Sequence, residues 1–243
     1  MTASAEVEVV LPVHNEAQRI GTTLEEMFQT ISPIATLSFI VSEDGSSDGT
    51  PEILEDLRER FPMKLISDLE RKGYSGAVID ALRVAEAPYV LCLDSDGQCD
   101  PADFDKFWSA RQSADVLIGA RLNRQDTALR KVLSGLFKRL HALLFSIQLS
   151  DPSCPFVLAR REVFAELLPS LGVLSQGFWW ELVARASGSG KSIVEIPVAH
   201  RRRAAGETQV YRLSKIPKIG WSHVIGLLRI WRQQRRATSR RFA

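Results

Sequence analysis

The chain has 243 residues, of which 45% are hydrophobic, so its length and composition suit one large α/β domain with a packed core rather than a disordered chain. The net charge of +2 is unevenly spread, because residues 1–200 carry 28 acidic and 19 basic side chains whereas residues 201–243 carry 1 acidic and 12 basic ones. The three cysteines lack metal-ligand spacing and no apolar run reaches about 18 residues, which argues against a disulfide framework, a zinc site and a membrane span.

The first half of the chain alternates strand-like and helix-like segments. Apolar runs predict strands at 7–13, 37–42, 63–67, 89–94 and 114–121. Helices are predicted between them at 16–31, with Asn15 as the N-cap, and at 51–61, 71–87 and 103–111. This alternation predicts a mostly parallel central sheet flanked by helices.

The second half is richer in helical and basic segments. Apolar residues at helical spacing between 129 and 147 predict an amphipathic helix, and further helices are expected at 161–168 and 178–186, with a late strand at 192–201. The tail mixes Trp, Ile and Leu with Arg and Lys. We therefore divide the chain into a domain at 1–210, in which 129–149 forms an interfacial helix, and a basic amphipathic tail at 211–243.

Two carboxylates close the fourth strand. The apolar run from Val90 to Leu93 ends at Asp94, and Asp96 follows two positions later. Ligands bind at the carboxyl edge of open α/β sheets. Neighbouring carboxylates favour a divalent cation that also binds a phosphate, although a bare pair of this kind is also found in ordinary polar turns.

Three more polar loops follow neighbouring strands on the same expected edge. They are "HNE" at 14–16, "EDGSSDG" at 43–49 and "RKGYSG" at 71–76. Together with "DSDGQ" at 94–98 they resemble the nucleotide-sugar domain of family 2 glycosyltransferases, which has the GT-A fold. The polyprenol-phosphate mannosyl- and glucosyltransferases are the most similar group, and the resemblance covers about residues 7–210.

The resemblance implies a nucleoside-diphosphate sugar as donor. Glu43 stands where the family usually has an aspartate, and Arg203 lies in a segment that closes over the donor diphosphate. The residues assigned to the donor by resemblance are Pro12, His14, Asn15, Glu16, Glu43, Asp44, Arg71, Gly73, Gly76, Asp94 and Arg203. The metal, Mg²⁺ or Mn²⁺, is assigned to Asp94, Asp96 and Gln98, which match Asp-x-Asp-x-Gln.

The acceptor implied by the resemblance is a polyprenyl phosphate. Arg121 and Arg130 match arginines beside the acceptor phosphate, and Ser153 lies in "DPSCPF", where Pro155 replaces a usual glycine. A phosphate monoester is already ionised near neutral pH and needs orientation more than deprotonation. Arginine suits this task because its fork binds phosphate bidentately. Asp96, Arg121 and Arg130 are therefore the expected catalytic residues, and the resemblance implies inversion at the anomeric carbon.

The expected role of Glu181 differs between a phosphate acceptor and the alternative, a hydroxyl acceptor. With a soluble or polysaccharide hydroxyl acceptor, a general base is needed and an acid in the "GFWWEL" segment is its candidate. With a phosphate acceptor, Glu181 is a helix residue near aromatic side chains.

The basic tail suggests an anionic partner. Trp221, Trp231 and their aliphatic neighbours, with the 129–149 helix, suit an anionic membrane surface. A nucleic-acid partner is the remote alternative, disfavoured because the rest of the chain is acidic. We expect a cytoplasmic enzyme that associates peripherally with the inner face of the cell membrane. The sugar, the base, the lipid length, the choice of metal and the oligomeric state are left open by the sequence.

Overall fold

A computed structural model of the chain describes residues 4–122, 128–201 and 216–241, with side chains described in 4–122, 134–201 and 220–236. Seven strands form one sheet in the order β3-β2-β1-β4-β6-β5-β7. The strands span Val7–Val13 (β1), Leu37–Asp44 (β2), Met63–Asp68 (β3), Tyr89–Cys92 (β4), Val116–Arg121 (β5), Val157–Arg160 (β6) and Ile193–Val198 (β7).

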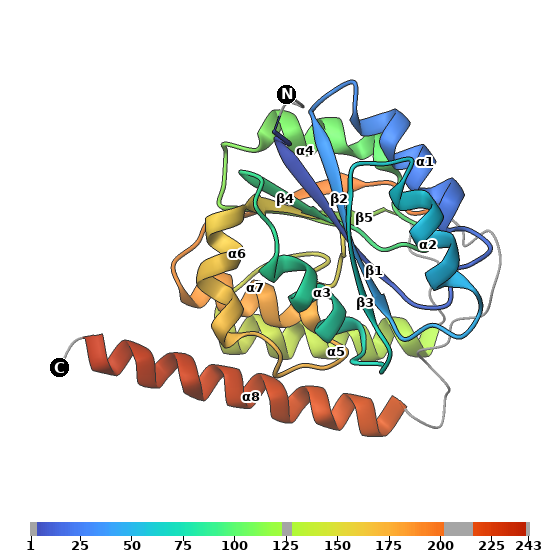
Figure 1. Cartoon of the computed structure of the whole chain (residues 1–243). Helices are drawn as coiled ribbons and strands as arrows, with labels where there is room; N and C mark the ends of the chain where they lie inside the picture. Colours follow the sequence, from blue (N-terminus) through green and yellow to red (C-terminus); the bar gives the residue numbers. More distant parts are fainter. Residues whose placement is uncertain (1–3, 123–127, 202–215, 242–243) are drawn as a thin grey trace.

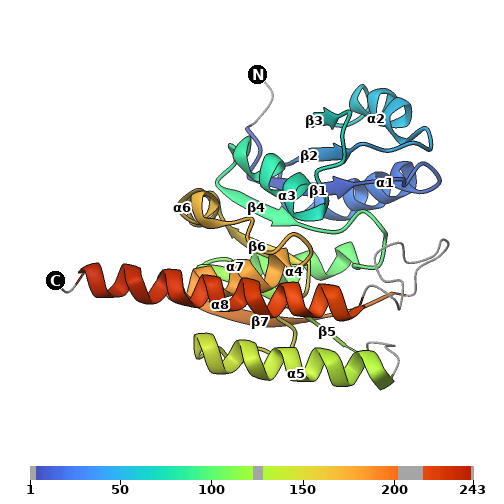
Figure 2. The same ribbon diagram turned by 90° about the horizontal axis from the view of Figure 1, so that it is seen from below.

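Helices cover both faces of this sheet (Figure 1). They span Ile20–Ile31 (α1), Thr50–Arg58 (α2), Tyr74–Arg83 (α3), Phe104–Ala110 (α4), Ala128–Phe145 (α5), Arg161–Leu167 (α6), Phe178–Gly188 (α7) and Ile216–Arg241 (α8), with 3₁₀ turns at Pro101–Asp103 and Leu168–Ser170. One face carries α1, α2 and α4, and the other carries α3, α6 and α7 (Figures 1 and 2). The prediction of a mostly parallel sheet flanked by helices is confirmed.

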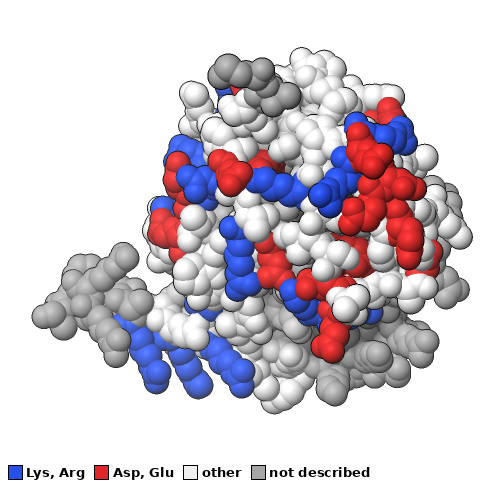
Figure 3. All heavy atoms as spheres, in the orientation of Figure 1, with Lys and Arg blue, Asp and Glu red and all other residues white. Residues whose placement is uncertain are grey.

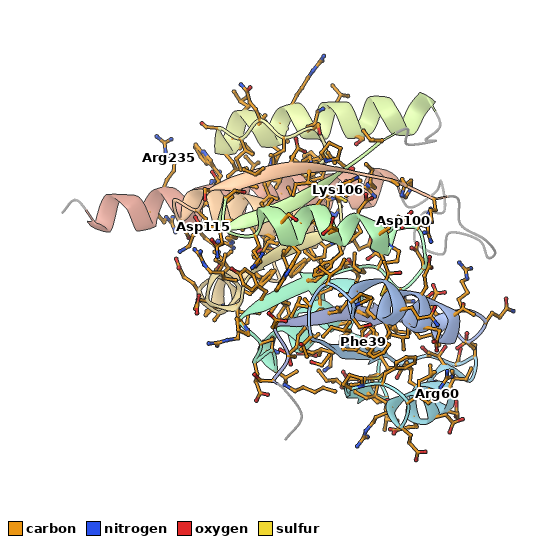
Figure 4. The ribbon with its side chains drawn as sticks, turned by 90° about the horizontal axis from the view of Figure 1, so that it is seen from above. Phe39, Arg60, Asp100, Lys106, Asp115 and Arg235 are labelled. Atoms are coloured by element: carbon orange, nitrogen blue, oxygen red, sulfur yellow. The ribbon has the colours of Figure 1, made fainter. Side chains whose placement is uncertain are left out.

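The strand β6 was not predicted. It runs antiparallel to both of its neighbours, β4 and β5, whereas the other pairings in the sheet are parallel. Four residues, "VLAR", are too short a signal to read as a strand beside the helix that follows. Because β6 is antiparallel to both neighbours, β5 still points the same way as β4, and the carboxyl ends of β1, β2, β3, β4, β5 and β7 meet at one edge. In Figure 4, Asp100, which follows β4, and Asp115, which precedes β5, lie at opposite ends of the strands.

The helix predicted at 16–31 begins later, at Ile20, and the prediction that Asn15 caps it is wrong. Asn15 takes the left-handed conformation with φ of 55°, and residues 16–19 form a turn in which the Glu16 carbonyl accepts from the Arg19 and Ile20 N–H groups. Asparagine tolerates this conformation better than most residues. The polar loop after β1 is therefore longer than predicted.

The last helix, α8, lies beside α5 along one side of the molecule (Figures 1 and 2). Leu227 and Ile230 of α8 are fully buried. Arg185 of α7 donates to Gln233 at 2.8 Å, and Gln234 donates to the Ala184 carbonyl at 2.8 Å. Part of the apolar face that the sequence suggested for a membrane thus packs within the protein, whereas Trp221 remains 69% exposed. The division at residue 210 stays a prediction.

Candidate active site

Polar side chains gather at the carboxyl edge of the sheet, as the order of the loops predicted. The segments after β1, β2, β3 and β4 lie next to one another because these four strands are parallel neighbours. Arg121, at the end of β5, and Arg201, after β7, reach the same edge from the other half of the sheet. The edge therefore combines residues that are more than 180 positions apart in the chain.

The first two loops are tied together by side chains. The Asn15 side-chain oxygen accepts from the Ser47 N–H at 2.8 Å, and the Asn15 backbone N–H donates to Ser46 Oγ at 2.9 Å. His14 Nδ1 lies 2.8 Å from the Asp44 carbonyl, and its Nε2 lies 3.2 Å from the Asn15 amide nitrogen. Both contacts are satisfied when the imidazole is neutral with its proton on Nδ1. His14 and Asn15 thus fix the shape of the loop in which the donor residues were predicted.

Glu43 and Asp44 are buried carboxylates that receive backbone N–H groups. Glu43 accepts from the Ser46 N–H at 2.5 Å and from Ser67 Oγ at 3.2 Å. Asp44 accepts from the Lys72 N–H at 2.6 Å and from the Gly73 N–H at 2.9 Å, and the Arg71 guanidinium lies 3.8 Å away. Charge-assisted bonds of this kind are strong, so both acids hold the second and third loops together.

Glycines are required where these loops touch. Gly45 has φ of +63°, and a side chain there would meet the Arg71 nitrogen at 3.0 Å. Gly73 has φ of +84° and directly precedes α3, while a side chain at Gly76 would meet Lys72 at 2.7 Å. The backbone of the third loop therefore approaches the second loop closely.

The loop after β4 presents Asp94 and Asp96 on its accessible side. Burial alternates along it, since Ser95 is 5% exposed and donates to the Pro12 carbonyl at 2.9 Å, whereas both aspartates are part-exposed. Tyr74 Oη donates to Asp94 Oδ1 at 2.7 Å. Asp96 Oδ1 accepts the Gln98 N–H at 3.0 Å, and its carbonyl accepts from Arg19 at 3.2 Å. Burial, and then the nearby Asp94 carboxylate, raises the pKa of Tyr74 well above its usual value, so the phenol stays protonated.

Gln98 links this loop to the segment after β7. Its side-chain nitrogen lies 3.4 Å from the Arg201 carbonyl and 3.5 Å from His200 Nε2. Its backbone carbonyl accepts the Arg201 backbone N–H at 2.9 Å. Arg201 also pairs with Asp100 at 2.8 Å and with Glu26 at 2.6 Å. Gln98 as a metal ligand stays a prediction, because its side-chain amide is directed toward His200 and Arg201.

The donor set at this loop suits a hard divalent cation. Within the described residues, no group of three or more His, Cys, Asp and Glu side chains is arranged as a metal site. Mg²⁺ is commonly bound by one or two carboxylates together with substrate phosphates, and Asp94 and Asp96 provide the carboxylates on one short loop. These residues fit such an ion as the partner of a diphosphate.

Arg121 is held by a bidentate ion pair. Its Nε and Nη2 donate to the two oxygens of Asp151 at 2.6 and 2.9 Å, and Nη2 also donates to Ser153 at 2.8 Å. Burial alone would lower the pKa of Arg121, but the bond to Asp151, with a smaller contribution from Asp94, raises it above its usual value. The guanidinium is thus permanently charged and lies within electrostatic reach of Asp94.

Two buried cysteines lie near the aspartate loop and Arg121. Cys99 and Cys154 are buried, and the pKa of each is raised, chiefly by burial, in the case of Cys154 to about 12. The charges of Asp94 and Arg121 both act on each thiol. These thiols are neutral and unreactive, and they mark how closely the aspartate loop and the Arg121 cluster adjoin.

Glu181 does not join the site. It is fully buried at the start of α7, where it accepts from the Leu174 N–H at 2.8 Å and from the Gly172 N–H and Arg185, each at 3.3 Å. Its carboxylate holds the 172–174 loop, and its role as a substrate-binding or base residue stays a prediction. Glu16 donates its N–H to Thr50 at 2.9 Å. The Arg130 side chain and all of Arg203 lie outside the described residues.

Several residues of the edge were not predicted as site residues. They are Arg19, Tyr74, Asp151, Trp179, His200 and Arg201. The adjacency of Asp151 to Ser153 in "DPSC" was a usable signal for one of them. Tyr74 and Trp179 are 105 positions apart, and only the packing of α3 against the second half brings them together.

A family model of glycosyl transferase family 2 matches residues 8–168. The chain is 27% identical to the undecaprenyl-phosphate 4-deoxy-4-formamido-L-arabinose transferase of Aeromonas hydrophila, over 91% of this chain and 65% of the relative. It is 29% identical to the dolichyl-phosphate hexose transferase of Haloferax volcanii, over 84% of this chain and 86% of the relative. The chain spans less than two thirds of the length of several curated relatives that it matches.

Solved structures share the fold at low identity. The mannosyl-3-phosphoglycerate synthase of Rubrobacter xylanophilus superposes with a TM-score of 0.71 at 18% identity, covering 96% of this chain and 75% of that one. The glucosyl-3-phosphoglycerate synthase of Mycobacterium tuberculosis, in complex with Mn²⁺, UDP and glucosyl-3-phosphoglycerate, gives 0.65 at 18% identity, covering 93% and 80%. The predicted GT-A fold is confirmed by this likeness.

Proposed function

The chain belongs to glycosyltransferase family 2, and from this premise we propose that it transfers a sugar from a nucleoside-diphosphate sugar to a polyprenyl phosphate. The observation that supports the proposal is that two aspartates, Asp94 and Asp96, and a buried arginine, Arg121, which is paired with Asp151, lie at one strand edge. Asp94 and Asp96 face the place for a cation and a diphosphate, and the Arg121 fork beside them suits a phosphate acceptor. The donor is of the GDP-mannose or UDP-glucose type.

On the donor side, the loops would bind and orient the nucleoside diphosphate. The loops carrying His14, Asn15, Glu43 and Asp44 would hold the base and ribose, and the Arg71–Gly76 loop would face the diphosphate. A Mg²⁺ or Mn²⁺ ion held by Asp94 and Asp96 would supply positive charge to the departing diphosphate. A solved neighbour contains Mn²⁺ with UDP, which supports the choice of a divalent metal.

On the acceptor side, the reaction needs placement more than proton transfer. The acceptor phosphate is already a dianion near neutral pH, so its oxygen attacks without a base while the nucleoside diphosphate leaves from the opposite side of the anomeric carbon. The configuration is thereby inverted. The charge of Arg121, held in place by Asp151, would attract and orient the phosphate, with Arg130 as its expected second partner. The relatives named as polyprenyl-phosphate transferases support this acceptor.

A hydroxyl acceptor is the alternative within the same family. It requires a general base, for which the sequence suggested Glu181. The burial of Glu181 and its bonds to Leu174 and Arg185 favour the phosphate acceptor instead. We expect Glu181→Gln to lower the melting temperature while leaving the pH dependence of transfer unchanged. Loss of the acidic limb of that profile, which the deprotonation of a general base would produce, would favour the hydroxyl acceptor.

The side of the molecule formed by α5 and α8 is the proposed membrane-facing surface. Leu136 and Leu143 of α5 are 56% and 81% exposed, and Trp221 of α8 is 69% exposed. Exposed arginines follow along α8, and Figure 3 shows a row of basic side chains over this helix. They are Arg229, Arg232, Arg235 and Arg236. No described helix is long and apolar enough to span a bilayer. We propose peripheral attachment to the inner, cytoplasmic face, where each cation contributes about 1 kcal/mol.

Flotation with liposomes tests this partner. We expect binding to vesicles that contain phosphatidylglycerol, weaker binding to neutral vesicles and release at high salt, because the attraction is electrostatic. A DNA gel shift at the same salt concentration tests the remote alternative. Binding to duplex DNA without binding to the vesicles would show that the partner is a nucleic acid and not a membrane.

A transfer assay tests the activity. Purified protein is incubated with Mg²⁺ or Mn²⁺, undecaprenyl phosphate and radiolabelled GDP-mannose or UDP-glucose, after a thermal-shift screen of nucleotide sugars has identified the donor that raises the melting temperature. Label should enter the lipid phase, and Asp96→Ala should abolish this transfer while the fold survives. Full transfer by Asp96→Ala would refute the proposed donor site.

A further inference from the structure

A chain of hydrogen bonds connects α7 to the aspartate loop through one tyrosine. Trp179 Nε1 lies 2.8 Å from Tyr74 Oη, and Tyr74 Oη lies 2.7 Å from Asp94 Oδ1. We propose that Tyr74, oriented by Trp179, is a positioning residue that fixes the Asp94 carboxylate for the divalent cation. This proposal rests on the proposed function, because it assigns a support to the cation-binding aspartate.

The direction of the two hydrogen bonds follows from the donor and acceptor groups of Trp179, Tyr74 and Asp94. The indole N–H of Trp179 is only a donor, so the phenol oxygen of Tyr74 accepts from it. The phenol has one proton, and the Asp94 carboxylate is the acceptor at 2.7 Å. Each member therefore has a defined role, and the phenol proton is directed at one particular oxygen of Asp94.

Both aromatic residues are themselves held in place. Tyr74 is the first residue of α3, and its neighbour Ser75 is buried and donates to the Leu174 and Ser175 carbonyls at 2.7 and 3.0 Å. Trp179 is 5% exposed, with its ring 4.8 Å from that of Phe178 and 6.5 Å from that of Tyr74, both edge-on. The support thus comes from two helices on the same face of the sheet, and neither ring has room to turn freely.

Such a support matters because Asp94 lies on a loop. Beyond the end of β4 the sheet no longer fixes the backbone, and Gly97 follows with φ of +70°. A carboxylate on such a loop has several rotamers, and a hydrogen bond from a rigid donor selects one of them. Groups that support metal ligands in this way typically change metal affinity by about 10–100-fold when they are removed.

The first experiment tests the hydrogen-bond chain itself, without substrate or metal. In a ¹⁵N-labelled protein, Trp179→Phe assigns the Trp179 indole signal by its disappearance. Tyr74→Phe should shift that signal upfield, because the indole loses its acceptor. Tyr89→Phe is the matched control, because Tyr89 lies at the start of β4 against Trp108, away from Asp94. An unchanged indole signal in Tyr74→Phe would contradict the chain.

The second experiment tests its consequence. Electron paramagnetic resonance counts free Mn²⁺ in the presence of UDP or GDP and gives the affinity of each variant for the metal–nucleotide complex. Tyr74→Phe should weaken Mn²⁺ binding about tenfold or more, whereas Tyr89→Phe should leave it unchanged. Trp179→Phe should weaken it less, because the phenol keeps its bond to Asp94, and the double variant should match Tyr74→Phe, because the two residues act in series.

The outcomes separate the two proposals. If the unsubstituted protein fails to bind Mn²⁺ in the presence of UDP and also in the presence of GDP, the proposed function fails and the role of Tyr74 fails with it. If the unsubstituted chain and Tyr74→Phe bind equally well, the role of Tyr74 alone is overturned. A fall in melting temperature without a change in Mn²⁺ affinity would likewise reduce Tyr74 and Trp179 to packing residues.

Discussion

The donor and acceptor sides of the strand edge are built in different ways. On the proposed donor side, the Asp44 carboxylate accepts two backbone N–H groups of the next loop, while Glu43 accepts the Ser46 N–H within its own loop. On the acceptor side, Arg121 is held by two side chains, Asp151 and Ser153, in a bidentate pair. Backbone contacts determine the shape of the first region, and side-chain contacts determine the placement of a charge in the second.

This difference separates two kinds of specificity. Loops shaped by backbone contacts suit the recognition of a nucleotide, whose base and ribose require a fitted surface. A pre-oriented arginine suits a phosphate, whose recognition requires charge and direction. Substitutions on the two sides should therefore change the kinetics for different substrates.

Arg121→Lys is expected to have the largest effect. Lysine keeps the charge but cannot reproduce the fork that bonds to both oxygens of Asp151. We expect kcat/KM for the lipid phosphate to fall by about 100-fold, which corresponds to about 3 kcal/mol, while the affinity for the nucleotide with Mn²⁺ stays within about twofold. Steady-state kinetics and calorimetric titration of the donor nucleotide measure the two quantities. An equal loss in both would show that the two sides are one cooperative unit.

Asp44→Asn breaks the donor side instead. The neutral amide is a weaker acceptor for the Lys72 and Gly73 N–H groups, so the third loop loosens and donor affinity should fall by about tenfold, which corresponds to about 1.4 kcal/mol. The KM for the lipid phosphate should not change. Calorimetric titration with the nucleotide measures the first effect and initial rates measure the second.

Asp115→Asn is the matched control for this change. Asp115 accepts the Ser192 N–H at 2.8 Å, as Asp44 accepts backbone N–H groups, but it lies at the opposite end of the strands (Figure 4). It should lower the melting temperature without changing donor affinity. Equal loss of donor affinity in the two variants would mean that Asp44 acts through global stability.

The smallest expected effect on transfer lies away from both sides, at His141 of α5, which should change the pH dependence of stability instead. Burial, partly offset by its bond to the Trp180 carbonyl, lowers the pKa of His141 to about 4. The unfolded chain, with a histidine pKa of about 6.5, then binds more protons than the folded chain between pH 4 and 6.5. Stability should be fully present above pH 6.5 and decline as the pH falls toward 4, by up to about 3 kcal/mol.

The comparison of melting curves of the unsubstituted chain and His141→Gln measures this contribution. The unsubstituted chain should lose more stability between pH 6.5 and 4.5 than the variant. Parallel pH profiles would show that His141 is protonated without cost in the folded chain. Transfer activity of the variant at pH 7.5 should be unchanged, because His141 contacts neither the aspartate loop nor the Arg121 cluster in the described structure.

The parallel half of the fold could be predicted because its signals are local. Each strand there is a short apolar run followed by polar loop residues, and the shared strand direction brings Asp94 to the edge where Asn15 and Asp44 lie. The strand β6 escaped prediction because its pairing partners, not its own four residues, define it. The start of α1 was misplaced because the left-handed conformation of Asn15 depends on its bonds to Ser46 and Ser47.

The site shows the same limit. The loops that follow the predicted strands do meet at one edge, whereas the supporting residues were not predicted, since their roles arise from contacts across the fold. Trp179 lies 105 positions from Tyr74, and Gln98 lies 103 positions from Arg201. The buried role of Glu181 was equally invisible, because it depends on how the 172–174 loop folds back onto α7.

Two acceptors that differ only in the phosphate group test directly whether the acceptor is a lipid phosphate. Undecaprenyl phosphate and undecaprenol are offered separately, in the same vesicles, with the radiolabelled donor that the thermal-shift screen selects. We expect label to enter the lipid phase with undecaprenyl phosphate and not with undecaprenol, and Arg121→Lys to lose most of this transfer. Equal labelling of both lipids, or labelling of undecaprenol alone, would contradict this expectation.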